Sequence, residues 1–147
     1  MKRIFPILFT IFIISSIIGC VSAPSQREIA VASVAKVYGS NEFLIMEVPS
    51  HGLIGDSVAI AAGGGGNASQ VRSALLEFQK AQGVQRLAIT SSNSLLAKTV
   101  LSSAVKKLPA DSLTNIQIAF VGDVAQGEEI RSLVEATGAQ FDVVGGK

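Results

Sequence analysis

The chain has 147 residues, with 12 Lys and Arg against 11 Asp and Glu, one Cys, one His and no Trp, and 48% of the residues are hydrophobic. This length favours one compact domain, and the near-neutral charge argues against an electrostatic nucleic-acid binder. A single Cys excludes an internal disulfide, and one Cys with one His does not make the usual zinc site. We therefore expect no metal site and no bound cofactor.

The first 20 residues have the layout of an export signal. Lys2 and Arg3 give a positive start, and a long uncharged stretch rich in Ile, Leu and Phe follows. The stretch ends in Ile17-Ile18-Gly19-Cys20, which resembles the lipobox of bacterial lipoproteins: a branched apolar residue, an apolar or small one, a small one, then Cys. The resemblance covers residues 1–20 only. It implies cleavage before Cys20, attachment of diacylglycerol to the Cys20 thiol and acylation of the new amino terminus.

Two other interpretations of this segment stay open. The stretch Val21-Ser22-Ala23 fits an ordinary small-residue cleavage site, which would release a soluble protein. The uncharged stretch is also long enough for an uncleaved transmembrane helix of about 20 residues, although Ser15, Ser16 and Pro24 weaken its second half. The position of the only Cys favours the lipoprotein. Val21, rather than Asp, follows the Cys, which in a Gram-negative source resembles the sorting pattern for the outer membrane, facing the periplasm.

This layout divides the chain into a signal peptide over residues 1–19, a tether over residues 20–25 and one α/β domain over residues 26–147. Ser25 and Glu28 form a capping-box pattern, which predicts a helix over residues 26–38. Alternation through Ile29, Val31 and Ser33 is the competing strand pattern. Branched and aromatic residues predict a strand over residues 42–48, and the Gly-containing stretch 49–56 is typical of a loop.

The rest of the chain alternates between strand and helix patterns. Apolar runs predict strands at residues 58–62, 86–90, 116–121 and 141–144. Helical periodicity predicts helices from a cap at Asn67 or Ser69 to Gly83, and over residues 94–108 and 126–137. Such alternation is typical of βαβ units. We expect a small parallel sheet of about four strands with helices on both faces, preceded by an N-terminal helix and an edge strand.

Ligands of open parallel sheets bind beyond the carboxyl ends of the strands. The residues expected there are small or polar, and they form the candidate ligand-binding set: Gly63, Gly64, Gly65, Gly66, Asn67, Ser91, Ser92, Asn93 and Asp123. The glycine run fits a loose G-x-G-x-x-A pattern whose backbone N–H groups suit an anion. It lacks the acidic residue expected about 20 residues later and a following Walker lysine. A structural turn is therefore the favoured interpretation, ahead of an anion site and of a dinucleotide site.

The sequence offers no convincing catalytic set. His51 is the only imidazole, Ser50 is its neighbour and Asp56 is an available acid, but there is no G-x-S-x-G elbow. A solvated loop histidine explains His51 more simply, because a triad is defined by geometry. Asp123 fits a Gly-Asp turn, and Glu128 and Glu129 fit a helix start. No catalytic residues are predicted, and a binding protein is a simpler interpretation of the sequence than an enzyme.

Two hypotheses about function follow. The first is a lipid-anchored cell-envelope protein that serves as a binding or assembly module for a protein partner, in secretion, pilus or envelope maintenance. The second is a periplasm-facing domain that binds or transforms a small ligand at the strand ends. Fold alone does not separate them. A crevice joining Gly64, Ser92 and Asp123 would favour the ligand, and a broad exposed apolar patch elsewhere would favour the partner.

Overall fold

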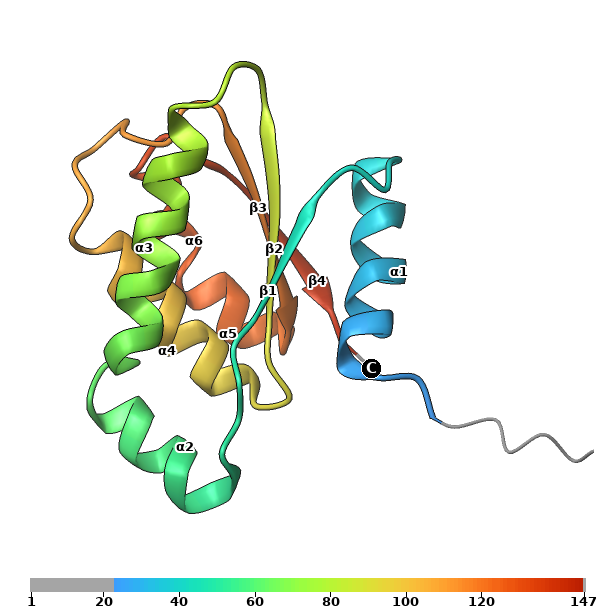
Figure 1. Ribbon diagram of the computed structural model, residues 1–147, viewed down its shortest axis with the longest axis vertical. Helices are drawn as coiled ribbons and strands as arrows, with labels where there is room; N and C mark the ends of the chain where they lie inside the picture. The colour runs from blue at the N-terminus through green and yellow to red at the C-terminus, as the bar shows by residue number, and fades with distance from the viewer. Residues whose placement is uncertain (1–22, 147) are drawn as a thin grey trace, which may run out of the picture.

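The computed structural model describes residues 23–146, which form a four-stranded, all-parallel sheet with helices on both faces (Figure 1). The signal segment, Cys20 and the first part of the tether lie outside the described residues. The strands follow the order β1-β2-β3-β4, which is also their order in the chain. They are β1 Leu44–Glu47, β2 Gln85–Thr90, β3 Ile116–Gly122 and β4 Gln140–Gly145. The helices are α1 Gln26–Tyr38, α2 Gly52–Ala61, α3 Gly65–Gln79, α4 Ser94–Val105, α5 Val124–Glu129 and α6 Arg131–Glu135.

The sequential strand order determines how the helices are distributed. Right-handed crossovers that all step in the same direction place their helices on the same face of the sheet. That face holds the larger core, in which side chains such as Leu87, Ile118 and Phe120 of the sheet cluster with Leu75 of α3 and Leu101 of α4. The opposite face would be bare without α1, which covers it (Figure 1). The expected fold class is therefore confirmed.

Two local features determine where helix α1 begins and ends. The Ser25 hydroxyl accepts the N–H of Glu28 at 3.2 Å, and the Glu28 carboxylate accepts the N–H of Ser25 at 2.7 Å. Gly39, at φ 61°, ends the helix in the left-handed conformation. Ala30 and Val34 then pack on small residues of the sheet, which let the helix lie close to it. The helix predicted from the capping box is confirmed, and the competing strand pattern is wrong.

The prediction of a strand at residues 58–62 is wrong, because these residues belong to α2 and the turn after it. A short apolar run does not by itself distinguish a strand from a helix. Here three alanines, Ala59, Ala61 and Ala62, give the run helix propensity. Helix α2 also begins at Gly52, inside the predicted loop. The fourth strand of the sheet is instead β1, inside the segment 42–48 that was expected to be an additional edge strand.

The other helices and strands lie near their predicted positions, except that one predicted helix is divided into two. The predicted helix over residues 126–137 begins earlier, at Val124, and is split into α5 and α6 at Ile130. Arg131 secures this break: its guanidinium pairs with Glu128 on one side and Glu135 on the other, and it also donates to the carbonyl of Phe141 at 2.6 Å.

The turn between α2 and α3 gives a stability prediction. Gly64 has φ 80°, and a Cβ there would lie 2.8 Å from Cγ2 of Val100. We expect Gly64→Ala to lower the free energy of unfolding by about 2 to 4 kcal/mol, because left-handed strain adds to the collision. Gly66 has open space and lies inside α3, so Gly66→Ala should be neutral or stabilise by about 0.5–1 kcal/mol. Urea unfolding of both variants measures the difference; equal effects would contradict this role for Gly64.

Candidate binding surfaces at the two ends of the sheet

The carboxyl ends of the strands bring together part of the predicted ligand-binding set. Ser91, Ser92 and Asn93 follow β2, and Asp123 follows β3. The Asp123 N–H donates to the Ser94 hydroxyl at 2.7 Å, which links the two strand ends directly. Asp123 also caps α5 by accepting the N–H of Gln126 at 2.9 Å. The polar groups at this end are therefore already used in holding helix starts in place.

The glycine run lies elsewhere. Gly63–Gly66 follow a helix rather than a strand, and Gly64 packs against Val100 in the second half of α4. A cavity of about 380 Å³ adjoins this turn, with Arg72 and Lys107 in its lining. Asn67 is in the first turn of α3 and lines a different, smaller cavity. Two of the glycines (Gly63 and Gly65), Asn67 and Ser92 thus line three separate cavities rather than one crevice.

The residue that organises the carboxyl end is Asp56 of α2. Only 3% of its surface is exposed, and three donors surround its carboxylate. Oδ2 accepts the Ser50 hydroxyl at 2.7 Å and the Asn93 side-chain amide at 2.8 Å, while Oδ1 accepts the His51 N–H at 2.8 Å. These bonds, that of Ser50 foremost, hold the pKa of Asp56 below its ordinary value. Asn93 in turn caps α4 through the N–H of Leu96, so one carboxylate connects the exit of β1, α2 and α4.

This cluster does not have the geometry of a serine-hydrolase triad. The Ser50 hydroxyl donates to the carboxylate instead of an imidazole, and His51 contributes its backbone N–H while its side chain is exposed. A general base works best with a pKa near the working pH. The carboxylate of Asp56, with its lowered pKa, is a poor proton acceptor. The cluster therefore stabilises the loop and the two helix starts.

A shallow cavity of about 490 Å³ adjoins the cluster. Its lining comes from the loop after β1, α2, the start of α4 and α5: Ser50, Gly52, Leu53, Asp56, Ser92, Asn93, Ser94, Leu95 and Gln126. Within the described part of the chain, Gln126 Oε1 is buried without a hydrogen-bond partner. Among the atoms of this lining, it is the buried polar atom left without a partner.

Helix α2 is apolar on both sides, because Ala59 and Ile60 pack against the larger core and its outer side is apolar as well. Its only charged residue, Asp56, points inward, whereas Leu53, Ile54 and Val58 are 88%, 85% and 66% exposed. The 100° spacing of helical residues places these three side chains on the same side, together with Ser57 and Ala61, which are also exposed. We call these five residues the α2 outer face. It is an exposed apolar patch without a charged group, and it lies at the carboxyl end of the sheet.

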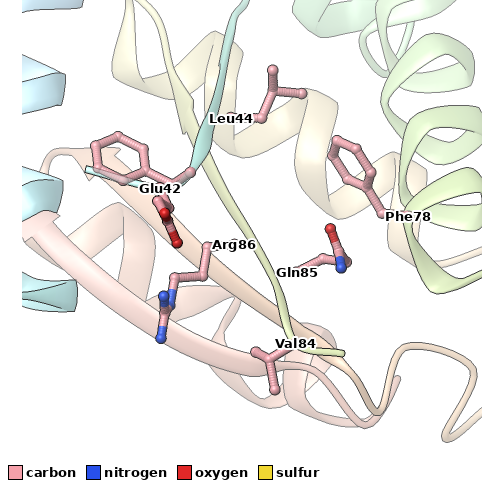
Figure 2. Close-up of a pocket in the computed structure, with 7 residues that line it drawn as sticks. Glu42, Leu44, Phe78, Val84, Gln85 and Arg86 are labelled. Carbon is pink, nitrogen blue, oxygen red and sulfur yellow. The ribbon is translucent and has the colours of Figure 1, made fainter. Parts of the chain in front are cut away.

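A second surface lies at the amino end, beside β1. Figure 2 shows a cavity of about 430 Å³ lined by Glu42, Phe43, Leu44, Phe78, Val84, Gln85 and Arg86, which we call the β1 groove. Leu44 from β1 and Phe78 from α3 line it on one side of the strands, and Glu42 and Arg86 lie on the other (Figure 2). Leu44 is 46% exposed and Val84 58%.

Leu44, the first residue of β1, lines this groove, and the outer edge of β1 continues from that residue. Within residues 23–146, β1 pairs only with β2. The Val48 N–H donates to the carbonyl of Thr90, and alternate residues of a strand direct their backbone groups to opposite sides. The N–H and C=O groups of Ile45 and Glu47 therefore point to the open side. Such an edge is a template for an added strand.

Comparison with known proteins returns no match among family models, curated proteins or solved structures. Within residues 23–146, no helix is long and apolar enough to cross a membrane. The same residues hold no group of three or more His, Cys, Asp and Glu side chains arranged for a metal ion. The features that bear on function are therefore the α2 outer face, the β1 groove and the amino-terminal signal pattern.

The hydrogen bonds of Asp56 predict a pH dependence. Its folded-state pKa is lowered, so its ionised form stabilises the fold above the unfolded-state pKa of about 3.9, and this stabilisation is lost as the pH falls through the folded-state value. In Asp56→Asn, the NH₂ group of the side-chain amide would replace one carboxylate oxygen. It would then face a hydrogen-bond donor where the wild-type protein has an acceptor. We expect this variant to have a lower free energy of unfolding at pH 7 and the difference from wild type to shrink below about pH 4. Urea unfolding across this range measures it, and a pH-independent difference would refute the assignment.

Proposed function

We propose that this protein is a lipid-anchored component of the cell envelope, on the outer membrane facing the periplasm, and that its α/β domain is a binding module for a protein partner. The lipobox resemblance at Cys20 supports the anchor. The open edge of β1 beside the β1 groove supports the binding of a partner. This second observation carries the proposal, because the described domain presents backbone donors and acceptors next to a cavity that has apolar side chains, Leu44 and Phe78, on one side.

The geometry of the groove suits an extended segment of the partner. Its backbone would pair with the free groups of Ile45 and Glu47, and an apolar side chain would enter between Leu44 and Phe78. Glu42 and Glu47 border the edge, and both are exposed. They favour a segment with basic residues. Arg86 does not neutralise them by an ion pair, since its side chain bonds Gln117 at 3.0 Å and lies over the Tyr38 ring.

A small polar ligand in the carboxyl-end cavity is the second candidate. The unpaired Oε1 of Gln126 favours it. Against it, Asp56, Asn93 and Asp123 already bind backbone or side-chain donors of the domain itself. A ligand there would have to compete with helix caps, so the protein partner is the better supported function.

The anchor is tested by metabolic labelling. We expect a palmitate analogue to label the wild-type protein and not Cys20→Ser, because the thioether to diacylglycerol requires the thiol. Gel fluorescence measures the label, and mass analysis of the mature amino terminus locates the cleavage. A wild-type protein cut after Ala23 and free of label would exclude the anchor.

The docking surface is tested by site-specific photocrosslinking in cells. A crosslinker at Leu44 or Val84 should give one discrete adduct, and the same crosslinker at Val31 should not. Val31 is a matched control, 38% exposed on α1 and outside the groove. The adduct formed through Val84 should disappear with Leu44→Glu and persist with Val31→Glu, because only the first places a charge on the side of the groove that Phe78 lines. Equal adducts from all three crosslinker positions would refute the groove as the docking surface.

A further inference from the structure

We infer that the α2 outer face lies against the lipid bilayer to which Cys20 anchors the protein, so that the domain contacts the membrane through Leu53, Ile54 and Val58. The inference rests on the proposed lipid anchor and adds a second, non-covalent membrane contact. Its occupant is the acyl-chain boundary of the bilayer, and not a protein.

The exposure of these side chains is fixed by the fold. For α2 to bury them, it would have to turn about its axis, and Asp56 would then leave the Ser50 hydroxyl, the His51 N–H and the Asn93 amide. The rotation would leave the Ser50 hydroxyl and the Asn93 amide without their acceptor, and it would expose Ala59 and Ile60, which pack against the larger core. The α2 outer face therefore stays outward in the isolated domain, and a surrounding phase other than water is needed to cover it.

The anchor leaves the domain at the same end as α2. The C-terminal end of α1 lies at the amino ends of the strands, where the Tyr38 hydroxyl contacts the carbonyl of Leu87. Its first residue, Gln26, therefore lies toward the carboxyl ends. In Figure 1 the start of α1 lies in the lower half of the view, and α2 lies at the lower end of the long axis.

The tether is too short to separate this end from the membrane. Six residues lead from Cys20 to Gln26, and even fully extended they span at most about 22 Å. The start of α1 thus lies within about 22 Å of the lipidated residue whatever path the tether takes. A tethered surface meets its target at a high effective concentration, so a few apolar side chains suffice where a free helix would dissociate.

The chemistry of the face identifies lipid acyl chains rather than charged headgroups. Interfacial helices that bind anionic lipid carry Lys and Arg on their polar face. The α2 outer face has Leu, Ile, Val, Ala and one Ser, and α2 as a whole has no basic residue. We therefore expect contact with zwitterionic bilayers and little change with ionic strength.

The test places a fluorophore on the full-length lipidated protein in protein-free phosphatidylcholine vesicles. Cys20 is the only Cys, and its thiol is blocked in the lipidated form, so Ile54→Cys offers a unique labelling site. Nitroxide on the acyl chains should quench a polarity-sensitive label at position 54 several-fold more than at Val37→Cys. Val37 is 48% exposed at the opposite end of α1. Adding Leu53→Glu and Val58→Glu should reduce quenching at position 54 to that of position 37, with an unchanged melting temperature because both side chains are exposed.

The outcomes separate this inference from the proposed function. A lipidated, folded protein with equal quenching at positions 54 and 37 overturns the bilayer contact and leaves the anchor and the β1 groove standing. Quenching at position 54 that survives the two Glu substitutions also overturns it, because the apolar face is then not the contact. A protein shown by mass to carry no lipid on Cys20 refutes the anchor and this inference together. Protection of position 54 only when native membrane proteins are added identifies a protein occupant and overturns the lipid one.

Discussion

The carboxylate of Asp56 is the constraint on which the carboxyl end of the sheet and the helices around it depend. It is buried, and it is tolerated there because hydroxyl, amide and backbone donors all bind its charged form. Through these donors it sets the exit of β1, the rotation of α2 and, by way of Asn93, the start of α4. Helix α4 supplies much of the larger core, including Leu96, Val100 and Leu101. One polar cluster thus connects the core to the helix that presents its apolar residues to the outside.

The arrangement of α2, with its charge turned inward and apolar residues turned outward, explains where prediction from the sequence succeeded and failed. Elements with ordinary patterns were predicted well: α1 by its capping box, and β2, β3 and β4 by apolar runs between helices. The segment 58–62 failed because an amphipathic helix is recognised by a polar outer side, and α2 has apolar residues on its outer side as well. A run that is apolar in every direction resembles a buried strand. The feature that misled the prediction is therefore the one that makes α2 a candidate surface.

The candidate site was predictable only in part, for a topological reason. Ser91–Asn93 and Asp123 do meet at one edge, as parallel strands require. Ligand crevices, however, form where the strand order reverses and helices diverge to opposite faces. In the order β1-β2-β3-β4 no such point exists among the described strands, and Asn93 and Asp123 cap helices instead. From the sequence, Asp56 is interpreted only as an acid available to His51. Its position as the lone charge between Leu53 and Ala62 was the available signal that it faces inward.

The two surfaces lie at opposite ends of the sheet, and this separation would give the proposed anchor a positional role. With the α2 outer face on the bilayer, the long axis of the domain stands away from the membrane and the β1 groove lies at the far end (Figure 1). The six residues of β2 alone span about 20 Å between these ends. A covalent tether by itself would let the domain tumble and present the groove in all directions. A second contact removes that freedom, so a partner segment that runs at this height above the membrane meets an open strand edge already oriented toward it, at a smaller entropic cost of binding.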